Sequence, residues 1–439
     1  MDKLHFNCKE TSLVPSSEMS DILSSLESYH EHLKEVYAED DYSYNESSLN
    51  LPSDSRRFEM VETLGENKSS TELKYIFLVG IGGSNLGAKA VYDALRGKLG
   101  SLSGEFPKLV FVDTVDPSLL RSARSVIKND IEDPKEFALA VVSKSGNTTE
   151  TIANFEVLVS ALKEEFDNFE NRIVAITDEG SSLDSSVSET DIDTLYIPDK
   201  VGGRFSVLSA VGILPLYLSE VDVYSLMDGA KKTVESCLGS EIGSNPAAIS
   251  ASLQYWWSQN GVNISNNFFF DPDLESLGKW YRQLMAESLG KEKNREGQKV
   301  NIGITPVASI GSTDLHSQAQ LYFGGPKDKF TNLVYVSSGE RGPSVPEKLY
   351  LGDIVSGVKG QDIHSLMDAL YGGVKEAYKK NNLPFVETVL DSVSAEPIGS
   401  YLQFKMMEIM YLGELLNVNA FNQPSVEDYK EETRKILES

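Results

Sequence analysis

The sequence has little cysteine, little histidine and too few positive charges to balance its acidic residues. Among 439 residues there are two cysteines, Cys8 and Cys237, and five histidines. Two thiols this far apart argue against a disulfide framework and are typical of a reducing compartment such as the cytoplasm. The formal charge of −26 at pH 7 argues against nucleic acid or an anionic membrane as a partner, because both favour a basic face.

Long apolar runs are also missing. No stretch approaches the roughly 20 residues that a membrane-spanning helix needs, so we expect a soluble protein. Residues 1–6 have neither the basic nor the apolar region of a signal peptide, and we therefore expect a cytoplasmic location. The length of 439 residues is enough for two or three domains.

From residue 74 onward, apolar runs alternate with stretches of helical periodicity. We expect strands at 75–79, 108–112, 137–142, 172–176 and 194–197. Helices are expected at 85–97, 117–128, 148–164 and 206–218. Continuous runs of Val, Ile and Phe fit strands that are buried on both faces. Their alternation with helices predicts right-handed βαβ units and a mainly parallel sheet.

A second α/β series follows a boundary region at 220–245. Its expected strands are at 267–270, 301–305, 332–336 and 384–389. Its expected helices are near 246–258, 274–290, 314–322, 362–380 and 397–416. The polar, Ser-rich residues 1–70 are expected to form an arm with a helix around 20–37. A charged helix is expected at 425–438, with Pro424 in its first turn.

Two turns between an expected strand and an expected helix consist of small and hydroxyl residues. The first is 80–85 (GIGGSN) and the second is 143–150 (SKSGNTTE). Backbone N–H groups and hydroxyls at such a place converge on an anion. Two of these turns in one α/β layer predict a phosphorylated small molecule as the ligand. The candidate binding residues in the turns are Gly83, Ser84, Ser143, Lys144, Ser145 and Thr148.

Nucleotide-binding motifs do not fit the first turn. A dinucleotide fingerprint needs a glycine where Asn85 stands, and a Walker A loop needs Gly-Lys-Ser/Thr at its end. A plain structural turn remains an alternative. In the second turn we expect Asn147 to cap the helix, with Glu150 as its capping-box partner, which leaves more hydroxyls than a cap needs. A cap that faces water, and a Lys144 that points into solvent, also remain alternatives.

Two further segments carry candidates for catalysis. Arg204 follows two glycines, which allow the backbone to bring a guanidinium close to a ligand. Gln283 and Glu287 are four residues apart in an expected helix and point the same way. Apolar neighbours can make such a glutamate a general base. A solvated arginine and a glutamate on a helix surface are the alternative interpretations of these segments.

Two more candidates lie towards the C-terminus. His316 follows a Gly/Ser turn and has no histidine partner at a metal-ligand spacing, so a role in acid–base chemistry fits it better than zinc binding. Gln423 and Lys430 are seven residues apart, which places them two turns apart on one helix face. A capping histidine and a solubilising lysine are the alternatives here.

In sequence order these segments closely resemble the glucose-6-phosphate isomerase family in its shorter bacterial form. The matching segments are 80–84 (GIGGS), 143–150 (SKSGNTTE), 202–212 (GGRFSVLSAVG), 287–291 (ESLGK), 313–317 (TDLHS) and 422–430 (NQPSVEDYK). Together they cover about residues 70–435, and six motifs in order make a specific match.

The resemblance implies two α/β domains of the phosphosugar-isomerase (SIS-like) type, each a mainly parallel sheet flanked by helices, with the active site between them. We expect these domains at 71–225 and 226–420, after the helical arm at 1–70. A C-terminal helix at 421–439 would complete the site. The resemblance also implies a homodimer in which His316 crosses to the partner's site, and no metal or organic cofactor.

The reaction implied by the resemblance is the interconversion of glucose 6-phosphate and fructose 6-phosphate through a cis-enediol. The two turns would hold the phosphate, and Glu287 would move a proton between C2 and C1. Arg204 would stabilise the enediolate, His316 and Lys430 would assist ring opening, and Gln283 and Gln423 would orient sugar hydroxyls. A regulatory protein that binds phosphosugars, and an isomerase that also accepts mannose 6-phosphate, remain alternatives.

Overall fold

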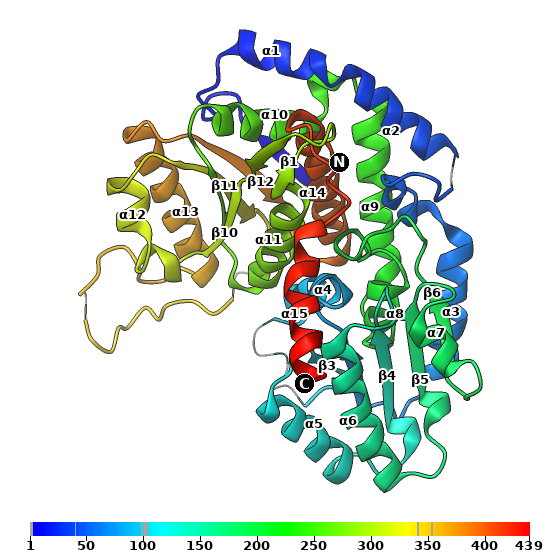
Figure 1. Ribbon diagram of the computed structural model, residues 1–439. Coiled ribbons are helices and arrows are strands. Elements are labelled where there is room, and N and C mark those ends of the chain that lie inside the picture. Colours follow the sequence, from blue (N-terminus) through cyan, green and yellow to red (C-terminus); the bar gives the residue numbers. More distant parts are fainter. Residues whose placement is uncertain (1–2, 40, 98–99, 101–103, 340–341, 353) are drawn as a thin grey trace. The chain divides into compact units, whose positions relative to one another are not determined.

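The computed structural model (Figure 1) describes residues 3–39, 41–97, 100, 104–339, 342–352 and 354–439. The chain divides into two compact units: His30–Val234, the middle unit, and Met1–Tyr29 with Glu235–Ser439, the terminal unit. The two divisions fall inside helices, α2 (Glu27–Glu39) and α9 (Val223–Gly239). The second of them lies within the boundary region expected at 220–245. The expected division of the chain into 1–70, 71–225, 226–420 and 421–439 stays a prediction.

The middle unit is built on a five-stranded, wholly parallel sheet in the order β3-β2-β4-β5-β6. Its strands are β2 (Tyr75–Val79), β3 (Lys108–Val112), β4 (Phe137–Val142), β5 (Ile173–Thr177) and β6 (Asp193–Tyr196). Its helices are α3 (Ser55–Lys68), α4 (Leu86–Arg96), α5 (Pro117–Asn129), α6 (Thr149–Glu165), α7 (Ser182–Val187) and α8 (Ala210–Leu218). The five strands expected in this part of the chain are confirmed to within one residue at each end.

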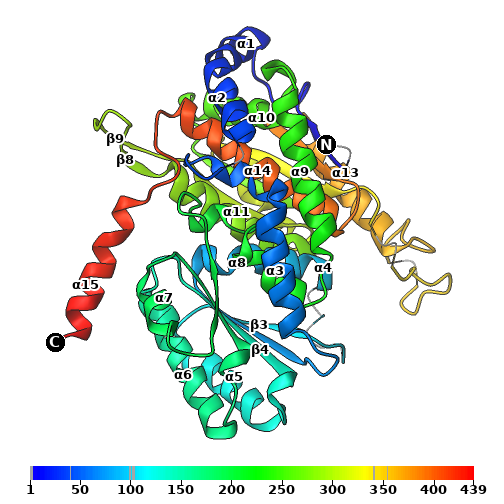
Figure 2. The ribbon, with the colours of Figure 1, turned by 90° about the vertical axis from the view of Figure 1, so that its right-hand side faces the viewer.

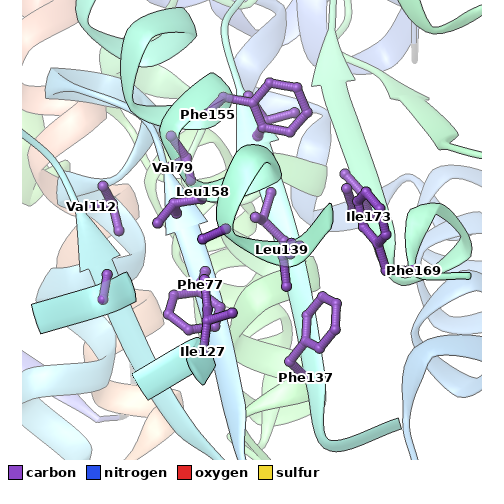
Figure 3. Packing of buried hydrophobic residues seen from close by; sticks show 14 of the residues in the cluster. Phe77, Val79, Val112, Ile127, Phe137, Leu139, Phe155, Leu158, Phe169 and Ile173 are labelled. Carbon is purple, nitrogen blue, oxygen red and sulfur yellow. The ribbon is translucent and has the colours of Figure 1, made fainter. Parts of the chain in front are cut away.

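The core of the middle unit explains why these strands are continuous apolar runs. β4 is buried at every position, and Phe77, Phe137 and Leu139 pack with Ile127 of α5 and Leu158 of α6 (Figure 3). Full burial of one such side chain stabilises the fold by about 1.5–3 kcal/mol. Parallel strands covered by helices therefore need apolar residues on both faces.

The terminal unit contains a second five-stranded sheet, in the order β1-β12-β11-β7-β10. Its parallel strands are β7 (Ile264–Phe269), β10 (Thr305–Ile310), β11 (Lys329–Val336) and β12 (Phe385–Leu390). Its helices include α1 (Ser16–Ser25), α10 (Pro246–Gln259), α11 (Glu275–Leu289), α12 (Ala319–Gly324), α13 (Ile363–Lys380), α14 (Ala395–Leu415) and α15 (Glu427–Leu437). The fold class, two mainly parallel sheets flanked by helices, is confirmed.

Buried polar side chains link neighbouring strands of this second sheet. The Ser309 hydroxyl donates to Asn266 Oδ1 at 2.9 Å, and Asn332 Nδ2 donates to Asn267 Oδ1 at 3.0 Å. The Thr388 hydroxyl in turn donates to Asn332 Oδ1 at 2.9 Å. Hydrogen bonds between neighbouring strands favour one register, and each contributes about 0.5–1.5 kcal/mol net.

The strand expected at 301–305 is wrong. Residues 299–302 form β9 (Lys299–Ile302), which pairs antiparallel with β8 (Lys291–Lys293) in a separate two-stranded ribbon, and β10 begins only at Thr305. Figure 2 shows this ribbon apart from the five-stranded sheet of the terminal unit. Gly303 lies between β9 and β10 in the chain, and a Cβ on it would lie 3.2 Å from Cα of Gly290. The apolar run therefore belongs to two strands, and β9 is largely exposed.

Three expected helices differ in their extent. The helix expected at 20–37 is two helices, because α1 ends before Leu26 and α2 begins after it. The helix expected at 206–218 begins at Ala210, where the Ser209 hydroxyl accepts from the backbone N–H of Val211. The helix expected at 314–322 is a 3₁₀ turn at Thr313–Leu315 followed by the short α12.

Strand β1 (Leu4–Asn7), which we did not expect, pairs antiparallel with β12 at the edge of the second sheet. Both cysteines are free thiols. Within the described residues, no helix is both long enough and apolar enough to cross a bilayer.

Candidate active site

The first glycine-rich turn follows β2 at the carboxyl edge of the middle unit's sheet. Gly82 has φ +59°, a left-handed conformation that suits glycine, and Asn85 Nδ2 donates to the Gly80 carbonyl at 2.6 Å. A Cβ on Gly83 would lie 2.3 Å from the carbonyl carbon of Gly203. Only a glycine therefore allows the two backbones to approach this closely, and the turn that carries Ser84 lies against the turn that carries Arg204.

The second turn brings two of the expected hydroxyls together. Ser143, which is buried directly after β4, has its Oγ 3.0 Å from Oγ1 of Thr148. Gly146 between them has φ +71°, and a Cβ on it would lie 2.5 Å from the backbone nitrogen of Leu183. Ser145 is exposed at the same turn. The turn therefore presents hydroxyls and backbone N–H groups at the start of α6.

The cap expected at Asn147 is wrong. Helix α6 starts at Thr149, its N-cap position is Thr148, and no side chain makes a capping hydrogen bond there. Asn147 is exposed. Because the hydroxyl of Thr148 contacts Ser143 instead of the helix, the first N–H groups of α6 receive no side-chain cap. An N-terminus of this kind is a favourable place for an anion.

Lys144 of the same turn already has two partners. Its ammonium donates to Asp178 Oδ1 and to the Asp199 carbonyl, both at 2.9 Å. Burial raises the pKa of the Asp178 carboxyl, and the nearby Lys144 works against that rise. The charge of Lys144 is thus partly neutralised within the protein, and its expected role in substrate binding stays a prediction.

Arg204 lies in a 3₁₀ turn, Gly203–Phe205, that follows β6 and precedes α8. The residue is only 4% exposed. The hydroxyl of Ser206 donates to the Gly203 carbonyl at 2.7 Å and thereby holds this turn. The cation is kept away from bulk water. Its field therefore acts more strongly on a neighbouring charge than it would in water. The turns after β2, β4 and β6 follow the carboxyl ends of strands of one parallel sheet, the edge where ligands bind in open α/β sheets.

In the terminal unit, helix α11 carries Gln283 and Glu287 on one face, as their spacing predicts. Gln283 Nε2 donates to Glu287 Oε1 at 3.1 Å, and both side chains are half-buried. The Gln283 Oε1 atom is buried and has no hydrogen-bond partner. A half-buried carboxylate with an amide at its side can accept a proton from a ligand and hold a sugar hydroxyl.

Lys291, to which sequence reasoning gave no role, joins two of the matched segments. Its ammonium donates to the Glu287 carbonyl at 2.6 Å and to the Asn422 carbonyl at 2.7 Å. The end of α11 is therefore connected to the residue before Gln423. The only signal in the sequence was the position of Lys291 at the end of the 287–291 motif.

His316 and Lys430 lie on two other elements of the terminal unit. His316 is exposed and follows the 3₁₀ turn after β10, where Asp314 accepts from the Ile310 N–H at 2.7 Å. Lys430 is half-buried on α15 and donates to Glu427 Oε1 at 2.7 Å. In the part of the chain that the structure describes, no group of three or more His, Cys, Asp or Glu side chains is placed to hold a metal ion.

The expected site residues thus fall into two sets, one in each unit. The middle unit holds Gly83, Ser84, Ser143, Lys144, Ser145, Thr148 and Arg204, and the terminal unit holds Gln283, Glu287, His316, Gln423 and Lys430. A parallel sheet with hydroxyl-rich and glycine-rich turns at its carboxyl edge, and a glutamine–glutamate pair on a helix, are the features expected of a phosphosugar isomerase.

Comparison with known proteins gives the family within this class. The family model described as phosphoglucose isomerase matches residues 55–333. A relative in Methanococcus maripaludis, named a probable glucose-6-phosphate isomerase, is 35% identical over 84% of this chain and 80% of its own. The glucose-6-phosphate isomerase of Carboxydothermus hydrogenoformans is 33% identical over 83% of this chain and 79% of its own.

A solved structure shares the fold of this chain. A hypothetical protein of Thermus thermophilus matches with a TM-score of 0.85 at 29% identity, covering 99% of this chain and 100% of its own. The chain belongs to the phosphoglucose isomerase family, and the family resemblance stated from the sequence is confirmed.

Proposed function

We propose that this chain is an aldose–ketose isomerase that interconverts glucose 6-phosphate and fructose 6-phosphate. Family membership and the names of its relatives support the reaction. The observation that carries the proposal is the Gln283–Glu287 pair at 3.1 Å on the otherwise largely buried α11. A sensor of phosphosugars needs no such carboxylate, whereas a proton transfer between carbon atoms does.

In this proposal the middle unit binds the phosphate. The hydroxyls of Ser143, Ser145 and Thr148, the turn of Gly83 and Ser84, and the uncapped N–H groups of α6 suit the phosphate oxygens. Binding energy at this end of the sugar orients the reacting end. This orientation raises the rate of the proton transfer.

Glu287 acts as the base of the proposed reaction. Its carboxylate takes the proton from C2 of the open-chain aldose, the C1 oxygen becomes the enediolate oxygen, and the cis-enediol forms. The oxygen on C1 receives the proton that the C2 hydroxyl loses, and the same carboxyl group gives its proton to C1, so the carbonyl moves from C1 to C2 and no atom is gained or lost. General acid–base catalysis of this kind contributes about 10²–10⁴-fold in rate.

The other candidates assist these two steps. Arg204 stabilises the negative enediolate oxygen, an effect that typically supplies about 10²–10³-fold. His316 and Lys430 transfer the protons of ring opening, and Gln283 and Gln423 orient hydroxyls. We further infer a cytoplasmic homodimer in which each copy contributes His316 to the site of the other.

The test is an exchange experiment in deuterated water with the purified chain. We expect it to convert glucose 6-phosphate to fructose 6-phosphate and to exchange deuterium into C2. Mass spectrometry measures the incorporated deuterium. Binding of the sugar phosphate without exchange would instead identify a regulatory protein. A parallel assay with mannose 6-phosphate separates an isomerase for one sugar from one that also accepts the C2 epimer.

A further inference from the structure

The terminal unit contains a fully buried ionic cluster that the proposed mechanism does not use. Its centre is the carboxylate of Glu408 on α14, which is 0% exposed. Oε2 accepts from Lys405 Nζ at 2.9 Å and from the Ser250 hydroxyl of α10. Oε1 accepts from the hydroxyl of Tyr281, which lies on α11. Three helices therefore meet at one carboxylate whose two oxygens are both hydrogen-bonded.

Stability alone does not account for these charges. A buried ion pair replaced by well-packed apolar residues often leaves a protein equally stable or more stable. The Lys405 side chain is 1% exposed, and its ammonium lies over the ring of Tyr281, with the nitrogen 4.8 Å from the ring centroid. Such a cluster accepts only one arrangement of its donors, because an unpaired buried charge or hydroxyl is costly. It therefore fixes where the helices stand relative to one another.

The titration behaviour of the cluster keeps its donors in place. Burial, and then the neighbouring Glu408, raise the pKa of the Tyr281 hydroxyl well above its usual range. That hydroxyl therefore remains protonated and donates at any physiological pH. Burial lowers the pKa of Lys405, and the Glu408 carboxylate opposes this change.

The geometry of α11 connects this cluster to the proposed base. At about 100° per residue, Gln283 lies about 200° and Glu287 about 240° around the helix from Tyr281. Tyr281 thus anchors the buried face of α11, while the glutamine–glutamate pair stands on a different face. A helix is stiff over so few residues, so a rotation or a slide that Tyr281 prevents would displace the Glu287 carboxylate.

We propose that Tyr281, held by the Glu408–Lys405 pair, is a positioning residue that sets the orientation of the Gln283–Glu287 pair. The inference rests on the proposed function, because it requires Glu287 to be the base. It predicts that the loss of one hydroxyl, which contacts no substrate, lowers turnover without weakening substrate binding.

The test compares Tyr281→Phe with one matched control and with one further substitution in the same cluster. Tyr378→Phe removes the hydroxyl of another buried tyrosine, which is 3.1 Å from Thr331 Oγ1 in the same unit and is not on α11. Ser250→Ala removes a different donor to Glu408 from α10. All three variants are expected to lower the denaturation midpoint modestly and to fold.

Tyr281→Phe is expected to change the kinetics most. A misplacement of 1 Å can cost roughly 10²-fold in rate, and for a smaller shift we expect kcat to fall about tenfold while KM changes less than about twofold. Tyr378→Phe should keep the kcat of the unmodified protein, and Ser250→Ala, which leaves the Tyr281 hydroxyl bound to Glu408, should lower kcat less than Tyr281→Phe does. A folded Tyr281→Phe variant with an unchanged kcat, or a Tyr378→Phe variant that loses as much, would overturn the proposal.

Hydrogen exchange separates this result from a failure of the proposed function. We expect the amides of residues 282–289 to exchange faster in Tyr281→Phe than in Tyr378→Phe, and unchanged exchange would refute the anchoring. If the unmodified protein has no isomerase activity, the proposed function fails, and the positioning role fails with it even when the exchange shows α11 to be anchored.

Discussion

The two units offer their candidate residues in different ways. The middle unit presents backbone N–H groups and hydroxyls from turns, and these turns are fixed by close backbone approaches such as that of Gly83 to Gly203. The terminal unit presents whole side chains from a helix, a loop and α15, such as Glu287, His316 and Lys430. A turn that holds a charged group of the substrate should govern binding, whereas a side chain that moves protons should govern turnover.

The largest expected effect is on the terminal side of this comparison. Glu287→Gln keeps the shape of the side chain but removes its ability to accept a proton at neutral pH. We expect kcat to fall about 10³-fold, within the range for loss of a general base, while substrate binding measured by calorimetry persists. Glu275→Gln, in the first turn of the same helix, is the control and should keep normal kcat. Near-normal turnover of Glu287→Gln would remove Glu287 as the base.

Arg204 is the exception in the middle unit, because its proposed role is in turnover rather than binding. Arg204→Lys keeps a positive charge but loses the planar fork of donors. We expect kcat to fall about 10²-fold, since a preorganised charge at the enediolate oxygen is worth about that much. Arg124→Lys, an exposed substitution near Glu164, should leave the steady-state kinetics unchanged. A change confined to KM would mean that Arg204 binds the phosphate instead.

The hydroxyls of the second turn should affect binding alone. Thr148→Val removes the Oγ1 that lies 3.0 Å from Ser143 Oγ, and a hydrogen bond to a charged group is worth about 1.5–3 kcal/mol. We therefore expect KM to rise about tenfold or more with kcat nearly unchanged. Thr151→Val is the matched control, because its Oγ1 is buried on α6 without a partner. An equal effect in both variants would indicate damage to α6 rather than a lost phosphate contact.

Sequence patterns predicted those strands and helices whose structure depends on their own residues. Strand β4 was predictable because every one of its residues is apolar, which a strand covered on both faces requires. Strand β1 was missed, since four residues of mixed polarity show no clear period and become a strand only by pairing with β12. The residues 301–305 were wrongly predicted as one strand, because their sequence does not reveal that β9 pairs with β8.

In the candidate site, too, the sequence predicted contacts within one helix but not contacts between distant residues. The spacing of Gln283 and Glu287 predicted their shared face, since four residues in a helix always place side chains together. The buried pair of Lys405 and Glu408 went unnoticed, because two charges three residues apart usually mark an exposed helix face. Lys144 was expected to face the substrate, and only the folded chain reveals the carboxylate 34 residues away.

The smallest expected effect concerns Lys144, the one basic side chain in the second turn, 143–150. Because Lys144 is paired with Asp178, we expect Lys144→Met to raise KM by no more than about threefold, as for a partly exposed ion pair. Lys144→Arg is the control and should keep the KM of the unmodified protein. A tenfold rise in KM for Lys144→Met would mean that the ammonium leaves Asp178 for the substrate.

The same substitution has a pH signature, which follows from the direction of the Asp178 shift. Burial raises the pKa of Asp178 and Lys144 opposes it, so Lys144→Met should raise that pKa further, as nuclear magnetic resonance titration of the carboxyl carbon would show. A carboxyl whose pKa is higher in the folded than in the unfolded state binds its proton more tightly when folded. Its contribution to stability is therefore present at low pH and is lost as pH rises from the unfolded value towards the folded one. Lys144→Met should accordingly lose more stability than the unmodified protein as pH rises above the ordinary aspartate value of 3.8, which denaturation curves at several pH values measure. Parallel curves would show that the two side chains do not interact in solution.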